Sequence, residues 1–186
     1  MCCIRQVINY MLSKLFYVKY SARVGPMNLT LSKRGDYVVR SALCLARAHE
    51  SGEYRKVREV VADMGIPRTY ASQILNSLVL VGLAESRAGK DGGYRLSRCP
   101  GSISVLEVVE AGEGPLKPER CALGDGPCRW EAVCPMHEVW SAATNAMRDE
   151  LANTTLANLA ARDLALERGE LLNPADHPTP RKTMTV

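Results

Sequence analysis

Two consecutive apolar patterns with helical spacing, followed at once by a glycine-rich hairpin, constrain the fold of this chain more than any other feature. The first pattern, YRKVREVVADMG, places its valines on one face of a short helix and stops at Gly65. After the dipeptide IP, a second helix is expected over residues 68–81, stopped by Gly82. The expected core residues of this second helix are Tyr70, Ile74, Leu78 and Val81. Two helices joined by a three-residue turn form a helix-turn-helix motif.

The segments LAESR and GYRLS are typical of two short strands around the loop AGKDGG. Glycines at positions 89, 92 and 93 allow this loop to fold back as a hairpin. A hairpin directly after the second helix is a wing, so the sequence predicts a winged helix-turn-helix. A further helix, expected over residues 32–49, precedes the pair and repeats its apolar residues at helical spacing.

The pattern restarts after Pro100. The stretch SVLE is a capping box that predicts a short helix from Ser104 to about Ala111, and GEGPLKPE is typical of a linker. A longer apolar stripe follows the cysteines and consists of Trp140, Ala143, Met147 and Leu151. This stripe suits packing within its own domain and packing against a second chain in a two-fold dimer equally well. The stretch NTTLANLA then interrupts and restarts the helix, with Thr154 or Thr155 as its cap.

These patterns predict a mainly α fold with a winged helix-turn-helix DNA-binding domain and a long C-terminal dimerisation helix. The expected parts are a leader, disordered or upstream of the true translation start, over residues 1–26; the winged DNA-binding domain, 27–100; a short helix and linker, 101–120; the cysteine cluster loop, 121–137; the dimerisation helix, 138–168; and a disordered tail, 169–186.

Charge is divided unevenly along the chain. Residues 27–100 carry 12 Lys and Arg against 7 Asp and Glu, whereas residues 119–170 carry 5 against 9. A basic half favours an anionic partner such as nucleic acid. No apolar run approaches the ~18 residues that cross a bilayer, so no membrane partner is expected. The absence of a convincing secretory signal predicts a cytoplasmic location, and no acid–base pair or nucleophile motif indicates an enzyme.

In a helix-turn-helix, the N-terminal turns of the second helix face the base edges of the major groove. Arginine can bind guanine and glutamine can bind adenine bidentately, while serine and threonine more often hold phosphates. The wing adds cationic side chains beside a backbone that its glycines keep accessible. The predicted DNA-binding residues are Arg68, Thr69, Tyr70, Ser72, Gln73, Asn76, Arg87, Lys90 and Arg95.

The segment CALGDGPCRWEAVCPMH holds three cysteines and a histidine, separated by six, five and two residues. A cytoplasmic location argues against a disulfide knot. Structural zinc favours close cysteine pairs and a redox dithiol favours tight spacing, whereas these gaps suit a loop around a body larger than one ion. Thiolates select iron–sulfur clusters or zinc, and a cluster normally takes four protein ligands. One ligand must therefore be something other than a local cysteine. Cys44, by contrast, is expected to be a small core residue.

From Met27 to about Arg168 the chain resembles the IscR/NsrR family of bacterial winged-helix regulators. The stretches that carry this resemblance are MNLTLSKRGDYVVRSAL, IPRTYASQILNSLVLVGLAESRAGKDGGYRLSR, the cysteine segment and TTLANLA. The resemblance implies a homodimer that ligates a 2Fe–2S or 4Fe–4S iron–sulfur cluster and changes its binding to operator DNA when the cluster is lost or damaged. By that analogy Cys121, Cys128 and Cys134 are cluster ligands.

The resemblance offers two candidates for the fourth ligand. His137, three residues after the third cysteine, matches the IscR branch, whereas Asp36 of the other subunit matches the NsrR branch. His137 is favoured because a local ligand needs no assumption about dimer geometry. The first gap of six residues departs from the expected five or so, and it leaves the cluster type open.

The function expected from this resemblance is a transcriptional regulator, expected to be a repressor. Its cluster would sense nitric oxide, redox stress or iron–sulfur status. The alternative is a DNA-binding thiol-redox or zinc-stabilised regulator that carries no iron–sulfur cluster.

Overall fold

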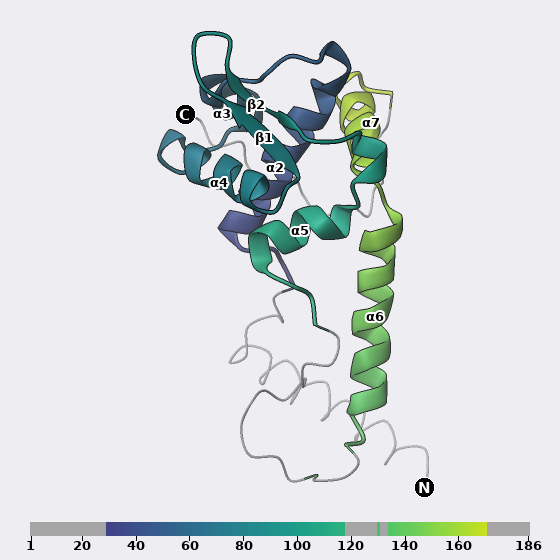
Figure 1. Cartoon of the computed structure of the whole chain (residues 1–186). Coiled ribbons are helices and arrows are strands. Elements are labelled where there is room, and N and C mark those ends of the chain that lie inside the picture. The colour runs from purple at the N-terminus through teal and green to yellow at the C-terminus, as the bar shows by residue number, and fades with distance from the viewer. Residues whose placement is uncertain (1–28, 118–129, 131–133, 171–186) are drawn as a thin grey trace, which may run out of the picture. The chain divides into compact units, whose positions relative to one another are not determined.

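The computed structural model describes residues 29–117, 130 and 134–170 (Figure 1). The chain divides into two compact units, Met1–Thr30 and Leu31–Val186. Nearly all of the first unit, like Cys121 and Cys128, lies outside the described residues, and everything below concerns the second unit. Its elements in chain order are α2 (Lys33–Arg47), η1 (His49–Ser51), α3 (Val57–Met64), α4 (Arg68–Leu80), β1 (Ala84–Arg87), β2 (Gly93–Leu96), η2 (Pro100–Ser102), α5 (Val105–Glu113), α6 (His137–Asn153) and α7 (Leu156–Glu167).

Helix α2 lies at the centre of the unit and packs against α3, α4, α5, α7 and β2. It begins where the Ser32 hydroxyl accepts a hydrogen bond from the Gly35 backbone N–H at 3.1 Å, which satisfies one donor of the first turn. Its inward face carries Val38, Ala42 and Leu45, all essentially without exposed surface. The apolar spacing of the sequence therefore marks the core face of this helix correctly.

The helix-turn-helix is formed by α3 and α4. Gly65, at φ +61°, ends α3 in the left-handed region that glycine adopts without strain. Helix α4 then buries Ala71, Ile74, Leu75 and Leu78. The prediction that Tyr70 and Val81 belong to this stripe is wrong, because each is 54% exposed. The buried face is rotated so that Ala71 and Leu75 lie inward in their place.

The predicted wing is a two-stranded antiparallel sheet in which Ala84 pairs with Leu96 and Arg87 with Gly93. The hairpin depends on Gly92, where an added Cβ would lie 2.1 Å from the Arg87 carbonyl oxygen. Strand β2 also meets the chain before α3, because Arg55 and Tyr94 exchange two backbone hydrogen bonds at 2.8 and 2.9 Å. The wing is thus joined by backbone to the start of the helix-turn-helix.

Helices α5 and α7 begin at a shared junction. The Ser104 side chain caps α5 and the Thr155 side chain caps α7, as the sequence predicts, and the two caps form an antiparallel bridge. Backbone N–H groups on either side bond across it, from Val105 to the Thr154 oxygen and from Leu156 to the Ile103 oxygen, both at 2.8 Å. The expected break at NTTLANLA therefore divides the C-terminal helical stretch into α6 and α7, with Thr155 as the cap of the second helix.

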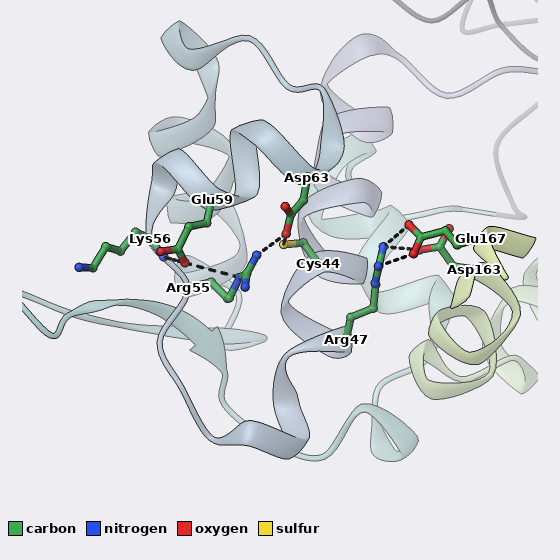
Figure 2. Close-up of polar contacts among 8 residues, drawn as sticks. All are labelled: Cys44, Arg47, Arg55, Lys56, Glu59, Asp63, Asp163 and Glu167. Atoms are coloured by element: carbon green, nitrogen blue, oxygen red, sulfur yellow. Dashed lines mark hydrogen bonds and ion pairs between the residues drawn. The ribbon is translucent and has the colours of Figure 1, made fainter. Parts of the chain in front are cut away.

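The two C-terminal helices differ in burial. Helix α6 has no buried residue, and Figure 1 shows it extending away from the helices packed around α2. Helix α7 buries Leu156 and Ala160 and packs against α2 and η2. Arg47 at the end of α2 donates to both oxygens of Glu167, at 2.7 and 2.6 Å, and to Asp163 at 3.3 Å. Figure 2 shows these contacts as dashed lines. Helix α7 is therefore part of the winged-helix core rather than a continuation of α6.

Within the described residues, none of the helices combines the length and the apolar character that spanning a membrane requires.

Candidate functional site

Helix α4 presents a polar face opposite its buried one. All six of its predicted DNA-binding residues are exposed: Arg68, Thr69, Tyr70, Ser72, Gln73 and Asn76. The ring of Tyr70 leans on that of Tyr37 from α2, with 6.4 Å between the ring centroids, and its other side stays in solvent. This face combines hydroxyl, amide and guanidinium groups over two helical turns, which are the groups that contact base edges and phosphates.

The three cationic side chains predicted on the wing differ in how they are held. Lys90 is exposed in the hairpin turn and Arg87 is exposed at the end of β1. Arg95 is ion-paired with Glu85 at 2.5 Å, and its guanidinium stacks over the Tyr54 ring, 4.6 Å from the ring centroid. Arg95 therefore stabilises the base of the wing. Arg87, whose guanidinium lies 6.0 Å from the centroid of the same ring, and Lys90 lie nearer the hairpin turn.

The Glu85 carboxylate is the hub of that small network. The Tyr54 hydroxyl donates to it at 2.7 Å, and this bond together with the Arg95 guanidinium lowers the pKa of the Glu85 carboxyl. The same bond raises the pKa of the Tyr54 phenol, because the proton is shared with an anion. A charged Glu85 beside Arg95 leaves the wing with less net positive charge than its arginines alone suggest.

Sequence reasoning missed two polar contacts of α4. Arg34 on α2 donates to the hydroxyl of the buried Ser77 at 3.2 Å, and Tyr94 on β2 donates to the side-chain oxygen of Asn76 at 2.9 Å. Both contacts join residues far apart in the chain, so no local pattern points to them. The run Lys33–Arg34, directly after the helix cap, was the available signal for further positive charge at this end of α2.

Two of the four expected cluster ligands, Cys121 and Cys128, are outside the described residues. The other two stand together at the start of α6, where the His137 backbone N–H donates to the Cys134 carbonyl at 3.0 Å. His137 is exposed and Cys134 is half-buried. A thiolate and an imidazole are suitable iron ligands, so this donor pair fits an iron–sulfur group. The described ranges alone contain no cluster of three His, Cys, Asp or Glu residues that could hold a metal ion.

Asp36, the alternative ligand, is already engaged within its own chain. Both of its carboxylate oxygens accept from Arg40, one turn further along α2, at 3.0 and 3.1 Å. Arg40 also donates to the Met64 carbonyl at the end of α3, at 3.2 Å. The carboxylate therefore helps to orient an arginine that joins α2 to the helix-turn-helix.

The segment before the cysteines is tied to both α5 and α6. Leu116 donates its N–H to the Glu110 carboxylate at 3.0 Å and accepts through its carbonyl from Arg148 at 3.4 Å. Arg148 on α6 also pairs with Glu110 at 3.3 Å. The Glu110 carboxylate and the Arg148 guanidinium thus connect α5, α6 and the backbone that leads into the cysteine segment.

The remaining described cysteines differ sharply in environment. Cys44 is 3% exposed, as the prediction of a core residue requires, and its thiol lies 3.7 Å from an oxygen of Asp63 (Figure 2). Burial raises the pKa of this thiol from 9.0 to about 11, against the opposing charge of Arg55. Cys99, beside η2, is exposed.

Comparison with known proteins identifies relatives over most of the chain. The Rrf2 family, described as an iron-dependent transcriptional regulator, matches residues 31–162. An HTH-type transcriptional regulator of Mycobacterium tuberculosis is 35% identical over 71% of this chain and 81% of its own length. The HTH-type transcriptional regulator IscR of Citrobacter koseri is 30% identical over 84% of this chain and 94% of its own length.

Solved structures show the same fold. CymR of B. subtilis, the global cysteine regulator of that organism, superposes with a TM-score of 0.61 at 25% identity, over 73% of this chain and 98% of CymR. IscR of T. potens superposes with a TM-score of 0.60 at 23% identity, over 81% of this chain and 97% of that protein.

Proposed function

This chain belongs to the Rrf2 family and is a transcriptional regulator, and from that premise we propose that it binds operator DNA as a homodimer under the control of an iron–sulfur cluster. Its expected action is repression in the cytoplasm, released when nitric oxide, redox stress or iron–sulfur shortage alters the cluster. The observation that carries the DNA-binding part is the polar face of α4, which is exposed over its whole length and lies beside a cationic wing.

Helix α4 would enter the major groove with its first turns toward the base edges. Thr69, Gln73 and Asn76 are spaced to share one side of the helix, and Arg68 stands at its start. Arg87 and Lys90 would contact phosphates beside the groove. Arg95, because it is paired with Glu85, would act mainly by holding the wing in position.

A second copy of the chain would cover the free face of α6. None of the helix's 17 residues is buried, and even its apolar residues Val139 and Met147 are 66% and 43% exposed. Such a helix has a face that its own unit leaves uncovered, and pairing two copies about a two-fold axis would bury it. The two α4 helices could then reach half-sites about one helical turn, or ~34 Å, apart.

Cys121, Cys128, Cys134 and His137 would hold the cluster, which when bound supplies a centre that reacts with nitric oxide and oxidants. His137 is the better fourth ligand, because it adjoins Cys134 while both oxygens of Asp36 are engaged by Arg40. His137 is the first residue of α6 and Cys134 lies three residues before it, so the ligand segment leads directly into the proposed dimer helix.

The chain itself offers a route from that segment to the DNA-binding unit. Leu116, Glu110 and Arg148 connect the segment before the cysteines with α5 and α6. Helix α5 in turn packs on α2 so closely that Gly112 has no room for a Cβ beside Gly35. A displacement of the cysteine segment would therefore shift α2 through α5, and α3 and α4 would move with α2 because they pack against it. A coupling of ~1–3 kcal/mol is enough to change operator occupancy.

The test is anaerobic purification of the full chain, with an absorption spectrum, iron and sulfide assays, and operator binding before and after nitric oxide. We expect coloured protein whose affinity for DNA changes on exposure. Cys128→Ala should lose colour, iron and the response, while the matched control Cys99→Ala, an exposed cysteine outside the ligand segment, should keep all three.

Several outcomes would contradict the proposal. Colourless protein with stoichiometric zinc would indicate a zinc-stabilised regulator, and colourless metal-free protein with a thiol-dependent response would indicate a redox regulator. If DNA were not bound in any of these states, the role of α4 would be wrong.

A further inference from the structure

One hydrogen bond joins the wing to the exposed face of α4. The hydroxyl of Tyr94, on β2, donates to the side-chain oxygen Oδ1 of Asn76 at 2.9 Å. Asn76 is exposed and Tyr94 is half-buried, so the bond lies at the edge of the polar face rather than in the core.

Tyr94 is itself held by its backbone. It exchanges two backbone hydrogen bonds with Arg55, at 2.8 and 2.9 Å, in the chain that leads into α3. The preceding Gly93 approaches the same segment so closely that an added Cβ would lie 2.4 Å from the Arg55 carbonyl oxygen. The backbone of Tyr94 is therefore fixed by the fold, and its partly buried side chain packs against the core.

The bond fixes which way the Asn76 amide points. An asparagine amide has an oxygen that accepts through two lone pairs and a nitrogen that carries two donors. With the oxygen directed toward the Tyr94 hydroxyl, the NH₂ group is left to face away from the wing. The amide therefore cannot exchange its oxygen and nitrogen by rotation about the side chain without losing this bond.

We propose that Tyr94 is a positioning residue that orients Asn76 so that its NH₂ group donates to a hydrogen-bond acceptor on the DNA. This inference rests on the proposed binding of α4 to DNA and deepens it. The acceptor is either a base atom in the major groove, such as N7 or O6 of guanine or O4 of thymine, or a phosphate oxygen. Without the Tyr94 hydroxyl, rotation of the amide would let its oxygen face the DNA in place of the NH₂ group.

The experiment uses anaerobically purified full-length chain and a duplex selected with it from a randomised library. Affinities are measured for wild type, Tyr94→Phe, Asn76→Ala and the double variant, on the selected duplex and on all its single-base substitutions. Tyr94→Phe keeps the ring and its packing, and thermal unfolding checks that the fold is retained. Ser102→Ala, which removes a hydroxyl that donates to the Cys99 carbonyl in η2 at 2.8 Å, is the control.

We expect Asn76→Ala to weaken binding about fivefold and Tyr94→Phe about two- to threefold, because each removes or releases one directed contact. In the Asn76→Ala background, Tyr94→Phe should have no further effect. A base acceptor is indicated if Tyr94→Phe relaxes the base preference at one position, and a phosphate if both losses are uniform over all duplexes. Ser102→Ala should bind as wild type does.

The inference is overturned if Tyr94→Phe weakens binding equally with and without Asn76, because the hydroxyl would then contact DNA itself or act on the fold. It is also overturned if Asn76→Ala binds like wild type while wild type selects a site normally. If the wild-type chain selects no duplex at all, the proposed function fails first, and that outcome is distinct from the other two.

Discussion

Arg40 donates from Nε and Nη2 to the two carboxylate oxygens of Asp36, one turn earlier in α2. Its Nη1 donates to the Met64 carbonyl at the end of α3. The pair is partly exposed, with 36% and 21% of the two side chains accessible, so its own contribution to stability is modest, about 0.2–1 kcal/mol. Its importance is positional, because it holds the Asp36 carboxylate against α2 and orients Arg40 toward the end of α3.

This relationship separates the two candidates for the fourth cluster ligand. We expect His137→Ala to lower the iron content and alter the absorption spectrum of anaerobically purified protein. Asp36→Asn, which keeps the shape of the side chain, should leave both close to wild type. If Asp36→Asn loses iron while His137→Ala keeps it, the ligand comes from α2 and the proposal for His137 is wrong.

The contact between α5 and α2 predicts a strong effect at one glycine. A Cβ on Gly112 would lie 2.7 Å from the Cα of Gly35, a backbone atom that cannot turn aside. Gly112→Ala should therefore lower the free energy of unfolding by about 1–3 kcal/mol, measured by urea denaturation. Gly101→Ala is the matched control, because the nearest atom to its Cβ is 3.8 Å away, and it should change stability by less than about 0.5 kcal/mol.

The ion pairs of Arg47 predict that charge helps to hold α7 in place. Arg47→Gln removes a bidentate contact with Glu167 and a second contact with Asp163, and we expect a loss of about 1 kcal/mol that shrinks in high salt. Urea denaturation at two salt concentrations measures it. Arg168→Gln, which breaks a 3.9 Å pair with Glu170 between two well-exposed side chains, should have little effect. Equal losses for the two variants would contradict a specific role of Arg47.

The environment of Cys44 predicts an unreactive thiol. Because burial raises its pKa to about 11, the thiol should stay protonated in the folded chain at pH 8 and resist alkylation, while the exposed Cys99 reacts. Mass-spectrometric mapping after brief iodoacetamide treatment distinguishes the two sites. Rapid labelling of Cys44 in folded protein would show that its surroundings open readily.

The same shift has a consequence for stability at alkaline pH. The unfolded thiol ionises near its ordinary pKa of 9.0, whereas the folded thiol ionises only near 11, so unfolding releases a proton between these values. The free energy of unfolding should therefore fall between about pH 9 and pH 11. It should fall less in Cys44→Ala than in wild type over that range, and equal slopes would contradict the assignment.

The sequence predicts the local elements well because each has a local cause. Gly65 ends α3, the Ser104 and Thr155 caps begin α5 and α7, and the glycines of the hairpin allow the wing. These signals act within a few residues, so they can be read without knowing the fold.

What the sequence does not predict depends on contacts between distant segments. Tyr70 has the right spacing for the core of α4, but the burial of Ala71 and Leu75 against α2 rotates the helix and leaves it exposed. The sequence predicts Arg95 as a DNA contact, whereas the structure pairs its guanidinium with Glu85 on the neighbouring strand. The bond from Tyr94 to Asn76 likewise requires the wing to be placed beside α4, which no periodicity specifies.

The bridged caps at Ser104 and Thr155 fix the C-terminal end of α6 to the start of α5. Helix α6 begins at His137, reaches this junction after 17 residues, and is also held to α5 where Arg148 pairs with Glu110. His137 lies about 16 Å beyond that second contact at 1.5 Å per residue, so a tilt of about one degree there corresponds to a movement of roughly 0.3 Å at His137. Conversely, a displacement of about 3 Å at His137 corresponds to a rotation of α6 by roughly ten degrees about its contact with α5.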